Sequence, residues 1–151
     1  MKFSNLFKAL AVVSLLSTAV ATAQAASEDD AIELRKTAMK GIGASMGGLK
    51  MVVQGKAGTD VAKGFADAMA AYASVAGGLF PKGSDFGDTR AKEEIWTKAD
   101  EFKAAVMAFE QAAQGMAKAA ASGDADAIKG AFGGLGKSCG GCHKPFRKPK
   151  S

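Results

Sequence analysis

The chain has 151 residues, of which 48% are hydrophobic, and its formal net charge is +5. This length supports a single domain with a single core. The basic excess is small and its lysines are not interleaved with aromatic residues, which argues against nucleic-acid binding.

Residues 1–25 have the features of a secretory signal peptide. Lys2 and Lys8 precede an apolar stretch over residues 10–20, and Ala-Gln-Ala at 23–25 is a small-x-small cleavage site. The apolar stretch is shorter than the ~20 residues that a membrane-spanning helix needs. We therefore expect export, with no membrane span after cleavage. Removing residues 1–25 from 151 leaves 126 residues and lowers the formal charge from +5 to +3.

The first half of the remaining chain predicts two amphipathic helices, because apolar residues recur at spacings of three and four. The first helix ends near Gly55 and has Arg35 at the one polar place in its stripe of Ile32, Met39, Ile42, Met46, Leu49 and Val53. The second is capped by Thr59 or Asp60 and carries the stripe Val61, Phe65, Ala68, Tyr72, Val75 and Leu79. Residues 81–87, rich in turn-forming types, then form the one long connection.

The second half predicts two more helices. The longest begins at a cap on Asp88 or Thr89 and carries Ile95, Phe102, Val106, Phe109, Ala113 and Met116. Ser122-Gly123-Asp124 breaks this helix, and a fourth follows with Ile128, Phe132, Leu135, Cys139 and Cys142 on one stripe. Four amphipathic helices joined by mostly short turns predict an all-α fold, an antiparallel four-helix bundle.

The fourth helix is unusually rich in glycine, with Gly130, Gly133, Gly134, Gly136, Gly140 and Gly141. Each glycine in a helix interior costs ~1 kcal/mol relative to alanine, so the group costs roughly 6 kcal/mol. That is a large part of the net stability of roughly 5–15 kcal/mol of a small domain. We interpret the glycines as allowing close backbone approach to a flat group.

Near its end the chain reads Cys139-Gly-Gly-Cys142-His143, and His143 is its only histidine. This spacing is the attachment signature of a c-type haem, in which each thiol forms a thioether and the histidine ligates the iron. On a helix the three side chains project from one side. A redox disulfide is the main alternative in an oxidising compartment. A structural zinc site is less favoured, because zinc requires four ligands and no second Cys/His cluster exists.

With this motif near its C-terminus, the chain resembles the cytochrome c′ family, the class II cytochromes c, over essentially all of residues 26–151. Phe146 and Arg147 continue the family's C-terminal pattern, and Arg35 with Met39 matches a pair in its first helix. Leu79-Phe80-Pro81-Lys82-Gly83 and Ile95-Trp96 also resemble the family.

The resemblance implies a periplasmic four-helix bundle with one covalently attached haem c and His143 as axial iron ligand. Arg35 lies on the buried stripe, where a haem propionate would balance its charge, or else it extends to solvent. Met39 would face the iron from the other side, either as a second ligand or only as a space-filling side chain. Arg147 belongs to the same haem-binding set.

Two functions follow from the resemblance. With Met39 off the iron, the haem is five-coordinate and suits electron transfer or binding of nitric oxide or carbon monoxide. With Met39 as ligand, the protein is a low-spin, six-coordinate electron carrier. A haem-free thiol–disulfide protein is the least favoured alternative. We do not expect an enzyme, since no acid–base groups are identifiable near the iron's open side.

Pro145 predicts that the last helix kinks or ends at His143, which would displace Arg147. The basic tail that follows is expected to be a solvated end, with docking of an acidic periplasmic redox partner as the alternative. The first helix carries the small residues Gly43, Ala44, Gly47 and Gly48. They would allow a homodimer through the first two helices, as is common in the family, or close packing within one subunit.

Overall fold

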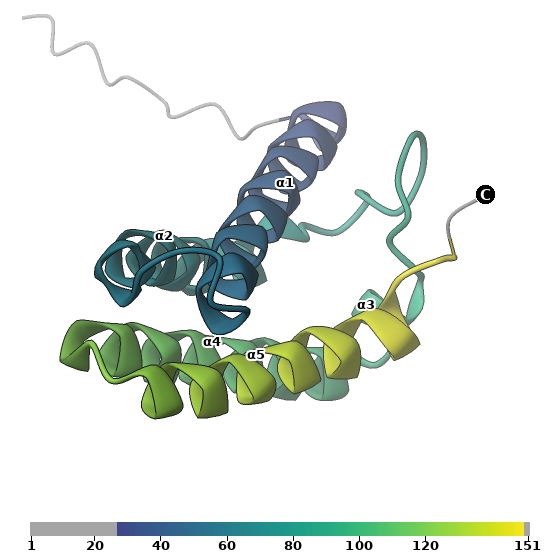
Figure 1. Ribbon diagram of the computed structural model, residues 1–151. Helices are drawn as coiled ribbons and strands as arrows, with labels where there is room; N and C mark the ends of the chain where they lie inside the picture. The colour runs from purple at the N-terminus through teal and green to yellow at the C-terminus, as the bar shows by residue number, and fades with distance from the viewer. Residues whose placement is uncertain (1–26, 150–151) are drawn as a thin grey trace, which may run out of the picture.

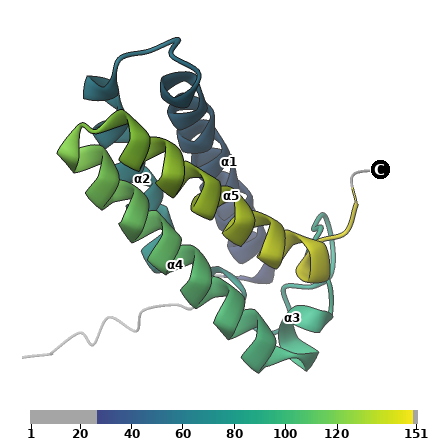
Figure 2. The same ribbon diagram turned by 60° about the horizontal axis from the view of Figure 1, so that its bottom comes forward.

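The computed structural model describes residues 27–149, so the expected signal peptide at 1–25 lies outside the described residues. Four long helices, α1 (Glu28–Val53), α2 (Ala62–Val75), α4 (Ala99–Ser122) and α5 (Ala125–Phe146), pack as a four-helix bundle (Figures 1 and 2). The predicted all-α fold class is thus confirmed. Among the described residues, no helix combines the length and the apolar character needed to cross a membrane.

Short elements occupy the connections between the long helices. Two 3-10 turns, η1 (Thr59–Val61) and η2 (Ala76–Leu79), flank α2, and the one-turn helix α3 (Glu94–Thr97) precedes α4. Figure 1 shows α4 and α5 side by side, while α1 rises away from them toward its N-terminal end. The long connection between η2 and α3 lies at that same end of the bundle.

The sequence specifies the helix ends by local hydrogen bonds. α1 begins with a capping box, in which the Ser27 hydroxyl accepts from the Asp30 amide and the Asp30 carboxylate accepts from the Ser27 amide, both at 3.2 Å. Gly123, at φ 71°, ends α4 in the left-handed conformation. The Asp124 carboxylate then caps α5 by accepting from the Ala127 amide at 2.7 Å. The predicted break between the last two helices is therefore confirmed.

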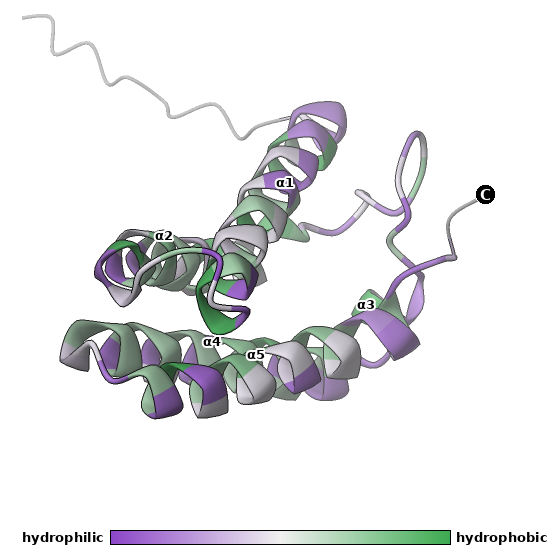
Figure 3. Ribbon diagram, in the orientation of Figure 1, coloured by the Kyte–Doolittle hydropathy of each residue, from purple (hydrophilic) through white to green (hydrophobic). Residues whose placement is uncertain are grey.

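Two hydrophobic clusters hold the bundle together. The larger lies among the four long helices and centres on fully buried Leu49, Met69, Met116, Ile128 and Leu135. The smaller comprises Ala91, Ile95, Phe102 and Phe146, and it lies where α5 ends. In Figure 3 the N-terminal turns of α1 and much of the long connection are hydrophilic. The second cluster thus anchors the connection to the bundle.

The predicted core face of α2 is wrong by one position. Its buried residues are Ala62, Ala66, Met69, Ala73 and Ala76, whereas Val61, Phe65 and Val75 are exposed. The small alanines let α2 approach its neighbours closely, and the larger Phe65 ring lies against Gly48 of α1. A Cβ at Gly48 would come within 2.6 Å of that ring, so Gly48 serves packing within the subunit. Gly43 and Gly47 instead face open space.

The third predicted helix is divided into α3 and α4. Lys98 adopts a non-helical conformation (φ −120°, ψ 51°) between α3 and α4. This bend directs Ile95 and Trp96 into the smaller cluster, where the Trp96 indole donates to the carbonyls of Phe80 and Pro81 at 3.1 Å. The expected cap is also wrong, because Asp88 and Thr89 bind side chains of α1 instead.

The interpretation of the α5 glycines is wrong as well. A Cβ built on five of them would meet nothing within 4 Å, and one on Gly136 would only touch the Met46 methyl at 3.7 Å. None of these glycines lines the pocket described below. Their cost in helix propensity is therefore not offset by any close approach among residues 27–149.

We expect Gly133→Ala and Gly134→Ala each to raise the free energy of unfolding of the haem-loaded protein by about 0.5–1 kcal/mol. Both sites are helical and open, so alanine adds propensity without a clash. Gly123→Ala should instead destabilise, because its φ of 71° disfavours a side chain. Chemical denaturation followed by helix circular dichroism measures all three. Destabilisation by the two α5 substitutions would contradict the expectation.

Candidate cofactor site

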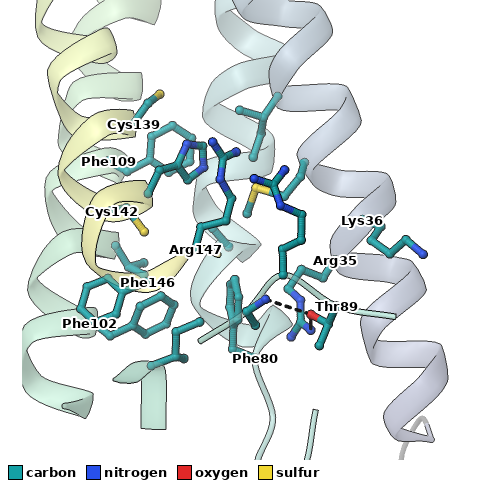
Figure 4. Close-up of a pocket in the computed structure, with 18 of the residues that line it drawn as sticks. Arg35, Lys36, Phe80, Thr89, Phe102, Phe109, Cys139, Cys142, Phe146 and Arg147 are labelled. Carbon is teal, nitrogen blue, oxygen red and sulfur yellow. Dashed lines mark hydrogen bonds between the residues drawn. The ribbon is translucent and has the colours of Figure 1, made fainter. Parts of the chain in front are cut away.

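A cavity of about 390 Å³ opens between α1 and α5, within the size range of small-molecule and cofactor sites. Its walls come from α1, α4, α5 and the long connection (Figure 4). All six residues singled out from the sequence line it, namely Arg35, Met39, Cys139, Cys142, His143 and Arg147. The fold thus brings together residues more than 100 positions apart in the sequence.

The α5 wall carries the two thiols and the imidazole. Cys139 and Cys142 are partly buried and are not bonded to each other. Burial raises the pKa of both thiols above its ordinary value, so they are protonated at neutral pH. The nucleophilic cysteine of a Cys-x-x-Cys redox site has a lowered pKa instead. The site therefore disfavours the thiol–disulfide interpretation.

His143 is kept neutral by its surroundings. Burial is the main cause that lowers its pKa, and the positive charges of Arg147 and Arg90 lower it further. A neutral imidazole offers a lone pair to a metal ion. Within residues 27–149, no three His, Cys, Asp or Glu side chains converge as a metal-binding group. An imidazole ligand here thus suits a metal that brings its own equatorial ligands, as haem iron does.

Arg35 on the opposite wall is buried, with 5% of its surface exposed, so the alternative in which it extends to solvent is wrong. Its guanidinium donates to the Leu79 carbonyl, to both the hydroxyl and the carbonyl of Ser84, and to the Thr89 hydroxyl, at 2.7–3.3 Å. It also lies 4.8 Å from the centre of the Phe80 ring. Arg35 therefore fastens the long connection to α1.

The positive charge of Arg35 has no carboxylate partner among the residues that line the cavity. All its acceptors are neutral, and burial lowers the pKa of its guanidinium. The one carboxylate on the cavity wall, Asp88, pairs with Lys36 at 2.7 Å. A buried cation without a counter-charge is costly, so the cavity fits a ligand that carries an anionic group.

The rest of the cavity is mainly apolar. Met39 and Ile42 come from α1, Phe109 comes from α4, and an aromatic group of Phe80, Phe102 and Phe146 closes one end. Phe102 meets the other two rings edge to face, with ring centres 4.9 and 5.3 Å apart. Apolar walls, an unbalanced cation and a Cys-x-x-Cys-His wall together match a haem with its propionates.

The expectation that α5 ends at His143 is wrong, since α5 continues through Phe146 with Pro145 inside it. Proline removes only its own amide donor, and two other amides satisfy nearby carbonyls. Arg147 donates to the His143 carbonyl at 3.1 Å, and Lys92 donates to the Phe146 carbonyl at 3.1 Å. Buried Phe146 then packs the last turn against Phe102. Arg147 consequently lies at the cavity, where the resemblance placed it.

Several cavity residues were not identified from the sequence. Arg90, Lys40 and Lys36 add positive charge to its wall, and Thr89 and Phe80 fix the Arg35 guanidinium. Arg90 and Thr89 lie in a loop, where no periodicity marks a buried or functional side chain. Their nearness to the predicted long connection was the only available signal.

The last helix of this four-helix bundle directs a Cys-x-x-Cys-His motif toward a cavity that is apolar and lined by basic residues. This arrangement defines the class of bundle cytochromes. A family model described as "Cytochrome C'" matches residues 30–147. Cytochrome c′ of Pararhodospirillum photometricum is 38% identical over 126 residues, which cover 82% of this chain and 100% of that protein.

Solved structures agree with this match. The nitric oxide complex of a leucine-to-isoleucine mutant of cytochrome c′ from Alcaligenes xylosoxidans has a TM-score of 0.77 and 30% identity, covering 83% of this chain and 100% of that one. A cytochrome c′ described as having an unusual ligand-controlled dimer dissociation has a TM-score of 0.79 and 32% identity, with the same coverages of 83% and 100%.

The chain belongs to the cytochrome c′ family. Its cofactor is accordingly a covalently attached c-type haem, as in the other members of that family.

Proposed function

We propose that the protein is exported to the periplasm and that its haem serves electron transfer or the binding of a small gas ligand. In this proposal Cys139 and Cys142 hold the haem through thioethers and His143 ligates the iron. The signal-peptide features of residues 1–25 support export. We further propose that the protein is a carrier and not an enzyme, since the one carboxylate on the cavity wall is paired with Lys36.

The observation that carries this proposal is the pairing of a Cys-x-x-Cys-His wall with an apolar wall in a single cavity. When bound, the haem supplies one-electron redox chemistry and a coordination position for a small ligand. The protein supplies the setting: Arg35 balances anionic charge, while Met39, Ile42 and Phe109 exclude water. Such a lining favours uncharged ligands such as nitric oxide and carbon monoxide, and nitric oxide is bound in the Alcaligenes xylosoxidans relative.

We propose that Met39 fills space and does not ligate the iron. Met39 is partly buried and packs against the main core, so its side chain has a structural role without a metal. The alternative is a low-spin, six-coordinate electron carrier. Both alternatives leave the thioether attachment unchanged.

Carbon monoxide distinguishes the two. We expect the Soret band of the reduced protein to shift on exposure to the gas, because an open iron position accepts it. Met39→Leu should leave the oxidised and reduced spectra without added gas nearly unchanged. If carbon monoxide leaves the Soret band of the native protein unchanged and Met39→Leu alters the spectrum strongly, the protein is the six-coordinate carrier instead.

We also propose a homodimer through α1 and α2. A shallow apolar groove lies between these helices, lined by Gly41, Ala44, Ser45, Val61, Gly64, Phe65, Ala68 and Tyr72. Its rim includes exposed Val61 and Phe65, and an unsatisfied apolar surface of this kind fits a second copy. A dimer is also described for one structural relative.

Val61→Lys should weaken this dimer about tenfold or more, because it places a charge within the buried interface. Sedimentation velocity over a concentration series measures the dissociation constant. Met107→Lys on α4 is the matched control, since Met107 is 48% exposed and Val61 42%. A wild-type protein that stays monomeric, or equal effects of the two substitutions, would refute the proposed interface.

A further inference from the structure

Positively charged side chains gather beside the cavity. We call this set the basic face, defined by Lys40 of α1, Arg90 and Lys92 of the connection, and Lys144, Arg147 and Lys148 at the end of α5. Lys92 is partly exposed and the other five are exposed. The ion pairs found within residues 27–149 involve Lys36, Lys63 and Lys98, and none involves the basic face.

Backbone pairing holds these like charges together. The Lys92 amide donates to the Phe146 carbonyl at 3.1 Å, and the Lys148 amide donates to the Arg90 carbonyl at 2.8 Å. The Arg90 guanidinium adds two bonds to the Lys148 carbonyl, at 3.0 and 2.7 Å. The basic side chains of this tail are exposed to solvent through Lys148, as expected, while its backbone is fixed next to a second basic segment.

The basic face adjoins the proposed haem site. Lys40, Arg90 and Arg147 line the same cavity as His143. Like charges fixed close together repel one another, which costs stability. The one carboxylate on the cavity wall, Asp88, pairs with Lys36 and not with the basic face, so the face remains complementary to an acidic surface.

We propose that the basic face docks the acidic surface of a one-electron redox protein. This inference rests on the proposed function, because docking here is useful only beside a redox-active haem. In the complex one electron would pass from the partner's reduced cofactor to the bound haem, so that the partner would be oxidised and the haem reduced, with no covalent bond formed or broken. Electrostatic steering accelerates such encounters and weakens as salt screens the charges.

The test uses the haem-loaded protein and a reduced flavodoxin with a strongly acidic surface as probe. Lys144→Glu combined with Lys148→Glu reverses two charges of the basic face without touching a cavity residue. Lys118→Glu combined with Lys129→Glu changes the net charge equally on exposed positions of α4 and α5. Lys129 and Lys144 are separated by 15 helical residues, which span ~22 Å. Calorimetry gives the dissociation constant of the complex between the two oxidised proteins, and stopped flow gives the rate of iron reduction.

At low salt, we expect the Lys144→Glu, Lys148→Glu variant to bind flavodoxin about tenfold or more weakly and to be reduced about tenfold or more slowly. The Lys118→Glu, Lys129→Glu variant should change the dissociation constant and the reduction rate by less than about threefold. Raising the salt from roughly 0.01 to 0.15 M should abolish most of the difference. Equal effects of the two pairs, or a wild-type rate independent of salt, would overturn the inference. Binding to anionic lipid vesicles that depends on the face, with unchanged flavodoxin kinetics, would also overturn it.

A separate control distinguishes failure of docking from failure of the site. Reduction by a small uncharged reductant and the carbon monoxide spectrum should be the same in all three proteins. If these are normal in the wild type and the flavodoxin results show no preference for the face, the proposed function stands and the docking inference fails. If the wild type has no haem spectrum at all, the proposed function itself fails.

Discussion

Replacing both Cys139 and Cys142 by serine is expected to abolish covalent haem attachment completely. Serine keeps the helix and the approximate volume but cannot form a thioether with a vinyl group. In-gel haem staining after denaturation should detect the wild-type protein and show nothing for the double variant. Any haem that binds to the variant should be extracted by acidified organic solvent.

The single variants sharpen this test. Cys139→Ser and Cys142→Ser should each keep one thioether, which the pyridine haemochrome spectrum reports as a band shifted from the two-thioether position. Ser138→Ala is the matched control, because Ser138 is next to Cys139 on the cavity wall but has no thiol, and its hydroxyl donates to the Leu135 carbonyl at 2.8 Å. Stable covalent haem in the double variant would contradict the proposed attachment.

Replacing Arg35 by methionine is expected to lower the free energy of unfolding of the haem-loaded protein by about 3 kcal/mol. The substitution leaves the carbonyls of Leu79 and Ser84 without their donor, and each buried unsatisfied group costs roughly 1–3 kcal/mol. Methionine retains much of the apolar contact with Phe80. The loss therefore reports the hydrogen bonds that fasten the connection to α1.

Lys36→Met supplies the matched control one residue away. Lys36 makes two ion pairs at 2.7 Å, with Glu33 and Asp88, but these carboxylates are 66% and 93% exposed. Exposed pairs contribute roughly 0–1 kcal/mol, so we expect a small change. Urea denaturation, followed by the fluorescence of Trp96 at the base of the connection, measures both variants. Equal losses would show that Arg35 does not anchor the connection.

The fold class and the α5 wall of the cavity were predictable because both depend on strong, local signals. Four stripes at helical spacing define the bundle, and a five-residue motif defines the α5 wall. The face of α2 was not predictable in the same way. Large residues such as Phe65 and Tyr72 normally indicate a core face, yet here they lie against glycines of α1 while alanines face the interior.

Tertiary contacts explain the remaining differences. The bend at Lys98 places Trp96 under two carbonyls that come from a distant loop, and no local pattern encodes that contact. Thr89 is of a residue type that often caps helices, but its hydroxyl instead accepts a hydrogen bond from the Arg35 guanidinium. Pro145 would end an isolated helix, whereas the paired segment at Lys92 and the buried Phe146 ring stabilise this last turn.

Mass analysis of one peptide tests the central claim most directly. Digestion of the purified, processed protein with trypsin should release residues 138–147, since Pro145 protects the bond after Lys144 from cleavage. We predict that this peptide carries the added mass of one haem, that fragmentation assigns it to Cys139 and Cys142, and that no other peptide is modified. A bare peptide with both thiols reduced, or joined as a disulfide, would contradict the account.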